Sequence, residues 1–308
     1  MICAYIDAYR SRFGVEPICV VLTAHGITIA PSTYARRRCT LVTQAEWDQA
    51  HLVNTLVDLH RANWGVYGQR KMWHAARRAG LGIGRDQVGR LMAIAGLSGV
   101  VRGHKTVTTQ RDAAAPRHPD LVRRGWRLPT APDQLWVADF SYVWTLAGFV
   151  YVAFVVDVFS RRILGWRVTT SRHADLVVDA LRQAVQTRRL AGATWQRGRL
   201  IHHSDAGSQY VSVALTAELL QAGIAGSIGT VGDALDNALC ESTIGLFKTE
   251  AVGASSWRDR RDVEWQVARW VHWYNTARLH SSIGHRSPVE HEHHHRQANT
   301  NTPTGEVA

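Results

Sequence analysis

The sequence predicts an α/β protein in which a small all-α region precedes a mixed five-stranded sheet with flanking helices. Helical patterns occupy residues 41–100, strand patterns begin at Gln134, and helix and strand patterns then alternate as far as residue 288. A chain of 308 residues, 45% of them hydrophobic, is long enough for two or three folding units with buried cores.

The first part of the chain has helical patterns. Residues 1–40 are a predicted helical lead-in that ends in Arg36–Arg38. Thr43 and Glu46 then have the spacing of a capping box, in which each residue satisfies a free backbone amide of the other at the start of a helix. A helix is therefore expected to begin at this point.

Two further short helical patterns follow within residues 41–100. The first ends at Gly80 and the second begins at Arg85, so the connection between them is tight. This arrangement predicts a helix-turn-helix-like domain, in which Arg85 and Arg90 are candidates for contacting DNA phosphates. A small helical bundle that makes no DNA contact fits the same pattern.

Residues 101–133 form a predicted basic linker. Lysine and arginine are frequent here, and Arg123 and Arg124 are adjacent. Such a segment can follow a phosphate backbone, and both arginines are candidate DNA contacts. A solvated tether between two domains would have the same composition.

A larger domain is predicted over residues 134–288. Strand patterns cover Leu135–Val143, Phe149–Val158, Ile163–Thr169, Leu200–His203 and Gly223–Ile228. Helical patterns follow the third and fourth strands and fill the region from Asp233 to Arg278. Three antiparallel strands followed by alternating helices and strands give a mixed sheet covered on both faces, which is the order of a ribonuclease H-like fold. The polar residues 289–308 are predicted to be a disordered tail.

Charge narrows the class of partner. The formal net charge of +11 favours a polyanion, of which DNA and RNA are the usual examples. The longest apolar run is too short to cross a membrane, so we expect a cytoplasmic protein, associated with the nucleoid if it is bacterial. The four cysteines form no Cys-x-x-Cys pair that would hold zinc.

Three acidic residues occur in unusual surroundings. Asp139 lies within an apolar and aromatic strand, Asp205 follows a strand and opens a glycine-containing loop, and Glu241 lies on a helix. A buried carboxylate is costly unless a cation or hydrogen-bond donors compensate it. Carboxylate oxygens suit Mg²⁺ or Mn²⁺, and two such ions can hold both the attacking and the leaving oxygen of a phosphoryl transfer.

Three blocks of the chain resemble the signature blocks of DDE transposases and retroviral-type integrases. They are Trp136-Val-Ala-Asp139-Phe-Ser-Tyr142, His203-Ser-Asp205-Ala-Gly-Ser-Gln-Tyr210 and Asp236-Asn-Ala-Leu-Cys-Glu241-Ser. The 35 residues between Asp205 and Glu241 are the spacing typical of that superfamily. The helical front and the ending Tyr274–Pro288 resemble the second-reading-frame subunit of the insertion-sequence-three family, so the similarity covers almost the whole chain.

This resemblance implies a transposase that cuts the 3′ ends of its element and transfers the strands. Asp139, Asp205 and Glu241 would be the catalytic metal ligands of two Mg²⁺ or Mn²⁺ ions, and Lys248 and Asn237 would contact the DNA end. The implied partners are the element ends, the target DNA, further copies of the chain on that DNA, and an upstream helix-turn-helix subunit, either separate or joined by a frameshift.

Other polar residues have simpler interpretations. His202 and His203 are expected to be structural or to face DNA, because Mg²⁺ prefers oxygen ligands. Asp157 is expected to bond Ser160 or Arg161, and Asp233 to cap the helix of Glu241. Trp265, Trp270 and Trp273 are expected in the core. Two alternative functions are a DNA-binding regulator without catalysis and a nuclease that acts on RNA–DNA hybrids.

Overall fold

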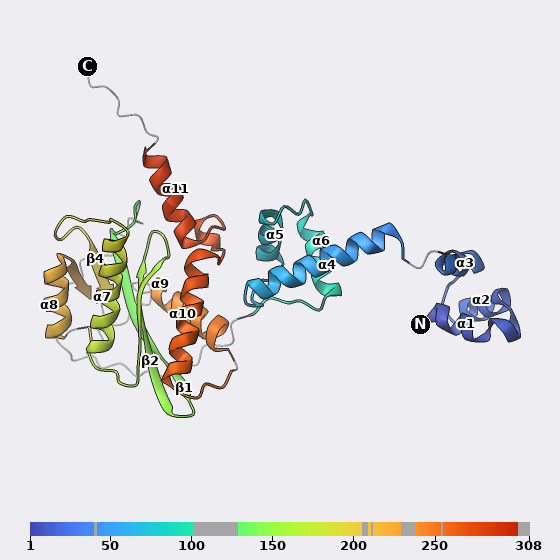
Figure 1. Ribbon diagram of the computed structural model, residues 1–308, viewed down its shortest axis with the longest axis horizontal. Helices are drawn as coiled ribbons and strands as arrows, with labels where there is room; N and C mark the ends of the chain where they lie inside the picture. Colours follow the sequence, from blue (N-terminus) through green and yellow to red (C-terminus); the bar gives the residue numbers. More distant parts are fainter. Residues whose placement is uncertain are drawn as a thin grey trace, which may run out of the picture.

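The computed structural model describes residues 1–39, 42–101, 129–204, 209–210, 212–228, 238–253 and 255–300. Within these ranges the chain forms three bodies that follow one another in Figure 1: helices α1–α3, helices α4–α6, and a sheet with helices on both sides. Most of the predicted basic linker, including Arg123 and Arg124, lies outside the described residues.

Both N-terminal bodies are helical, as predicted. The first consists of α1 (Ile2–Phe13), α2 (Val15–Ala24) and α3 (Pro31–Cys39). The second consists of α4 (Gln44–Ala62), α5 (Gln69–Arg78) and α6 (Arg85–Ile94). The capping box is confirmed, because the Thr43 hydroxyl accepts from the Glu46 amide at 3.2 Å and the Glu46 carboxylate accepts from the Thr43 amide at 2.9 Å.

The sheet has the strand order β3-β2-β1-β4-β5. Its strands are β1 (Leu135–Thr145), β2 (Gly148–Asp157), β3 (Ile163–Thr169), β4 (Ile201–Ser204) and β5 (Ala225–Ile228). The first three strands are antiparallel neighbours, whereas β4 runs parallel to β1 and β5 runs parallel to β4. The sheet is therefore mixed and five-stranded, as the sequence predicts.

Helices cover both faces of this sheet. One face packs against α7 (Asp175–Leu190) and α8 (Val213–Ala222), and the other against α9 (Ala238–Phe247) and α10 (Arg260–Thr276). A π-helical turn, η1 (Lys248–Val252), continues α9. Helix α7 lies so close to β3 that a Cβ atom at Gly165 would overlap the Ala180 carbonyl oxygen. This arrangement confirms the predicted ribonuclease H-like fold.

Two expectations are wrong. Residues 289–300 of the predicted disordered tail are ordered, because they belong to helix α11 (Pro288–Thr300), and residues 301–308 lie outside the described residues. Glu292 on α11 is almost fully buried and bonds the guanidinium groups of Arg162 and Arg188, which fixes the helix to the domain. The histidine-rich part of this helix is also ordered, since the rings of His291 and His295 pack against Phe159.

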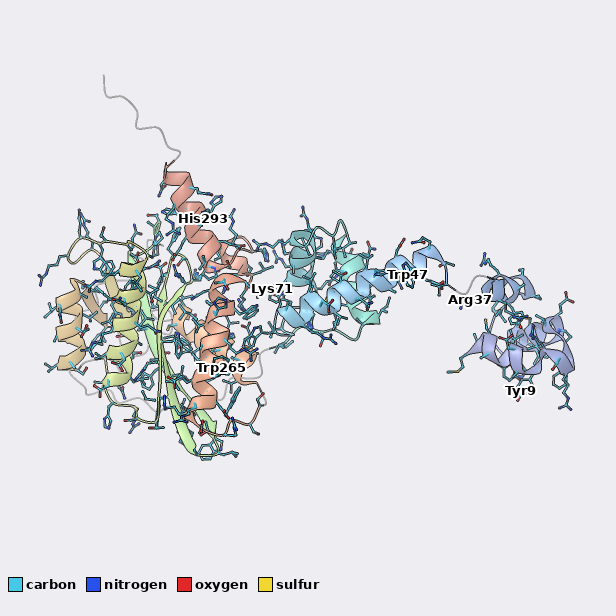
Figure 2. The ribbon with its side chains drawn as sticks, in the orientation of Figure 1. Tyr9, Arg37, Trp47, Lys71, Trp265 and His293 are labelled. Carbon is cyan, nitrogen blue, oxygen red and sulfur yellow. The ribbon has the colours of Figure 1, made fainter. Side chains whose placement is uncertain are left out.

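The second wrong expectation concerns one tryptophan of α10. Trp270 and Trp273 are buried, but Trp265, which is labelled on α10 in Figure 2, is 68% exposed. The helical period explains the difference. Trp265 comes two residues after the buried Val263, which places it about 200° around the helix from the buried stripe.

The helical domain α4–α6 shares one apolar core with the sheet domain. Tyr67 is fully buried, and its hydroxyl accepts a hydrogen bond from the Leu279 amide at 2.7 Å. The rings of Trp64 and Trp273 stack at 5.6 Å, and Arg78 makes a two-point ion pair with Glu290. Lys71 lies at this junction in Figure 2, where burial lowers the pKa of its ammonium to about 8.

A buried ion pair lies beside the junction. The Arg278 guanidinium bonds Glu250 on η1, with Nε 2.9 Å from Oε2, and both side chains are almost fully buried. Arg278 also lies 3.2 Å from Nδ1 of His280, while Nε2 of His280 lies 3.4 Å from the Tyr274 carbonyl oxygen. Burial, with Arg278 nearby, lowers the pKa of His280 to about 2. His280 is therefore neutral in the folded protein.

The neutral His280 should make stability depend on pH. The unfolded chain binds a proton at this position below a pH of about 6.5 and the folded chain does not, so the contribution of His280 to stability is lost as the pH falls, by up to about 1.4 kcal/mol per pH unit. Asp157 changes stability with pH in the opposite direction. Burial raises its pKa to about 6, so the folded chain binds this proton more tightly and gains stability as the pH falls. The measurement is therefore a comparison of urea unfolding at pH 7.5 and 5 for the wild type and His280→Gln. The variant should lose less stability on acidification, and equal losses would contradict the prediction.

Candidate active site

Asp139 lies in the middle of β1, on the face that packs against α9 and α10. Its cross-strand partner on β2 is Phe154, whose ring lies 5.3 Å from that of Phe247 on α9. Val137, two residues before Asp139 and on the same face, belongs to the same apolar cluster. Asp139 is only half-buried, and one of its carboxylate oxygens accepts from the Phe140 amide at 2.8 Å.

The pairing of β1 with β4 leads directly to the second predicted acid. The two strands are parallel and in register from Leu135 with Ile201 to Ala138 with Ser204. In the sequence, Asp139 follows Ala138 and Asp205 follows Ser204. Asp205 lies outside the described residues, so the structure fixes the register of the chain up to its immediate neighbour.

Glu241 lies in the first turn of α9, directly after a residue that contacts β1. Cys240 is fully buried, and its Sγ lies 4.0 Å from the carbonyl oxygen of Val137. Cys240, Ile244 and Phe247 form the buried side of α9, and Glu241 is half-buried at its border. The start of α9 therefore lies against the strand that carries Asp139.

Lys248 follows Glu241 by seven residues, which is two helical turns. It is exposed at the start of η1, and its ammonium lies 4.9 Å from the centre of the Tyr142 ring on β1. Asn237 and Asp233 lie outside the described residues. The structure thus describes Asp139, Glu241 and Lys248 among the predicted residues of this site.

The described residues contain no group of three or more His, Cys, Asp or Glu side chains that could hold a metal ion. Two of the three predicted ligands, Asp139 and Glu241, are among them. Both offer carboxylate oxygens only, the donor type that Mg²⁺ and Mn²⁺ prefer.

Comparisons with known proteins identify the family. Residues 129–234 and 222–288 match models of the integrase core domain, and residues 46–105 match a model of an HTH-like domain. The transposase for insertion sequence element IS629 from Shigella sonnei is 42% identical over 297 residues, which cover 93% of this chain and 94% of that protein. This chain belongs to the insertion-sequence transposases.

A second relative is also described as a transposase of an insertion sequence. The putative transposase for insertion sequence element IS986/IS6110 from Mycobacterium tuberculosis is 46% identical over 263 residues, which cover 85% of this chain and 94% of that protein. Among solved structures, the catalytic core domain of BIV integrase is 17% identical, covers 55% of this chain and 99% of that chain, and has a TM-score of 0.40.

The other acid and histidines near the transposase site have structural roles. Asp157 is fully buried, and one of its oxygens accepts from both the amide and the hydroxyl of Ser160, as predicted. His202 and His203 are buried within β4, and Nδ1 of His203 lies 3.0 Å from the Ser227 hydroxyl on β5. Burial lowers the pKa of His202 to about 4, so it is neutral in the folded transposase.

In the HTH-like domain, α6 carries both predicted phosphate contacts. Arg85 and Arg90 are exposed, and Arg85 lies 3.4 Å from the neighbouring Asp86. Their exposure leaves both side chains accessible to a ligand. Within the described part of the transposase, no helix is long and apolar enough to cross a membrane.

Exposed rings on the hairpin that carries Asp139 are not among the residues predicted from the sequence. Tyr142 and Trp144 on β1 and Phe149 on β2 are 45%, 64% and 49% exposed. Tyr142 and Phe149 occur within predicted strand patterns and Trp144 directly follows one, and in strands an aromatic ring commonly packs against its neighbours. Strict alternation along β1 offered a signal, because Tyr142 and Trp144 share a face that differs from that of the buried Val143.

Proposed function

We propose that this transposase cuts the 3′ ends of its insertion sequence and joins them to target DNA, with Asp139, Asp205 and Glu241 as ligands of two Mg²⁺ or Mn²⁺ ions. The contact between Cys240 and the Val137 carbonyl carries the proposal. It brings the helix of Glu241 onto the strand of Asp139, although the two acids are far apart in the sequence. The β1–β4 register supports the inclusion of Asp205.

The proposed residues would divide the work as follows. Asp139, Asp205 and Glu241 would hold the ions, which would supply Lewis-acid stabilisation to the attacking and leaving oxygens. Lys248, exposed two turns beyond Glu241, would hold a phosphate of the DNA end as a point charge. Asn237 would contact the same end.

Two phosphoryl transfers would follow in this site. In the first, a water oxygen attacks the phosphorus that joins the element to its flank, the bond to the element's 3′ oxygen breaks, and that oxygen leaves as a hydroxyl. In the second, this hydroxyl attacks a phosphodiester of the target. A new P–O bond forms, the target's own 3′ oxygen leaves, and the proton passes to it.

An assay for joined products tests the proposal. Purified protein is incubated with Mn²⁺ and a labelled duplex that carries the terminal repeats of the chain's own element. Nicked 3′ ends and longer, joined strands are expected. Binding without any cutting would favour a DNA-binding regulator, and preferential cutting of RNA–DNA hybrids without joined products would favour a nuclease.

The proposed partners are element ends and target DNA, contacted also by Arg85, Arg90, Arg123 and Arg124. We further propose that several copies assemble on this DNA, at the bacterial nucleoid, and that an upstream helix-turn-helix subunit assists, either separate or fused by a frameshift. Light scattering with and without end DNA would measure the assembly. Co-purification of the tagged chain with the product of the upstream reading frame would detect the subunit.

A further inference from the structure

The outward face of the β1–β2 hairpin carries exposed aromatic rings, Tyr142, Trp144 and Phe149, which together are called the aromatic face. Trp144 and Phe149 are direct cross-strand partners, and Tyr142 precedes Trp144 by two residues on the same face. The Phe149 ring lies 4.8 Å from that of Trp144 and 5.3 Å from that of Tyr142, both edge-on. The rings therefore form one contiguous surface.

This surface is held rigidly. The Leu146 and Ala147 amides at the hairpin turn donate to the carbonyl oxygens of Trp257 and Arg258, at 2.8 and 3.1 Å. The Thr145 hydroxyl closes the turn by donating to the Gly148 carbonyl oxygen at 2.7 Å. Rings presented on a fixed hairpin lose little conformational entropy when a ligand binds them.

The aromatic face lies on the strand that carries Asp139, but on the opposite side of the sheet. Tyr142 follows Asp139 by three residues, which corresponds to about 10 Å along β1, and this odd spacing places the two side chains on opposite faces. The Lys248 ammonium lies 4.9 Å from the centre of the Tyr142 ring, so a positive charge adjoins the rings. In the opposite direction along the same face of β1, the Phe140 ring lies 6.1 Å from that of Tyr210, five residues after Asp205.

We infer that the aromatic face binds unpaired nucleobases of a DNA strand that passes the catalytic residues. Aromatic rings stack on bases of any sequence, and an adjacent cation pairs with the phosphates between them. A purely apolar protein partner would gain nothing from Lys248 at the border of the rings. The inference rests on the proposed function for the presence of DNA at this end of the sheet.

Binding measured without metal separates this inference from the catalytic proposal. Fluorescence anisotropy of a labelled oligothymidylate would be recorded with the full chain in EDTA, so that no cleavage occurs. A second strand of equal length, with abasic sugars in place of the central thymidines, keeps the phosphates and removes the bases. The test variant is Trp144→Ala/Phe149→Ala, and the matched control is Trp265→Ala, which removes an equally exposed tryptophan from α10.

The double variant should bind the oligothymidylate about tenfold more weakly than the wild type. It should bind the abasic strand with unchanged affinity, and with an unchanged dependence on salt, because no phosphate contact is removed. Trp265→Ala should match the wild type, and Trp144→Phe should retain most of the affinity. Thermal unfolding should be the same for all four proteins, since the substituted side chains are exposed.

Three results would overturn the inference. The first is equal affinity of the double variant and the wild type for the oligothymidylate. The second is an equal loss on the abasic strand, which would indicate a phosphate or folding effect. The third is a change of oligomeric state with unchanged strand binding, which would assign the rings to contact with a second copy. None of these depends on whether the protein cleaves DNA.

Discussion

Asp139→Asn and Glu241→Gln should each reduce strand cleavage and joining by at least about 100-fold, the loss that removal of one group stabilising transition-state charge commonly causes. Both substitutions keep the size of the side chain and remove one negative charge from the proposed metal site. Asp205→Asn should behave in the same way. Cleavage and joining would be quantified on gels with end-containing DNA and Mn²⁺, and DNA affinity by anisotropy.

The proper control is an exposed acid of the same domain. Asp175 lies in the first turn of α7 and is exposed, so Asp175→Asn should leave cleavage unchanged. DNA affinity of the triad variants should stay within a few-fold of the wild type, because the proposed ligands act through metal. Cleavage that survives in any one variant would remove that residue from the site.

Arg188→Met should lower the free energy of unfolding by about 3–5 kcal/mol, the usual cost of breaking a buried ion pair. Arg188 is only 3% exposed. Its Nε lies 2.7 Å from Asp133, its Nη2 2.8 Å from Glu292 and its Nη2 3.5 Å from Asp157. Without the guanidinium, these buried carboxylates would lose their shared cation. Urea unfolding followed by circular dichroism measures the change.

Arg182 on the same helix offers a matched control. Its side chain is 58% exposed and pairs with Glu218 at 2.9 Å, and exposed pairs contribute about 1 kcal/mol or less. Arg182→Met should therefore destabilise the protein much less than Arg188→Met. If the two substitutions lowered the free energy of unfolding equally, burial of the Arg188 network would contribute nothing to stability.

Much of the sheet domain was predictable from local patterns. The strand patterns of β1 and β2 and the order of the elements predicted the mixed sheet, and the residues around Asp139 and Glu241 predicted two acids on adjoining elements. Helix α11 was not predicted, because the polar composition of its residues is typical of a disordered tail. A local signal was present: Ser287 and Glu290 have capping-box spacing, the Ser287 amide donates to the Glu290 carboxylate at 2.8 Å, and Pro288 occupies the first helical position.

Contacts between distant segments leave no local pattern in the sequence. The hydrogen bond from the Leu279 amide to Tyr67 joins residues 212 positions apart, and no periodicity within either segment predicts it. The Arg188 network likewise combines Asp133, Asp157 and Glu292 from three separate segments. Such pairings depend on how the elements pack in three dimensions, which a pattern within one element does not specify.

The junction at Tyr67 has a mechanical consequence. Two domains joined only by a tether can swivel freely, whereas turning α4–α6 relative to α10 would expose the apolar surface that they share. A DNA duplex bound by α6 would then be held at a fixed distance from the catalytic end of the sheet and in a fixed rotational orientation relative to it. Inserting half a turn of DNA, about 5 base pairs, between the gripped sequence and the cleaved phosphate should therefore impair cutting more than inserting a full turn.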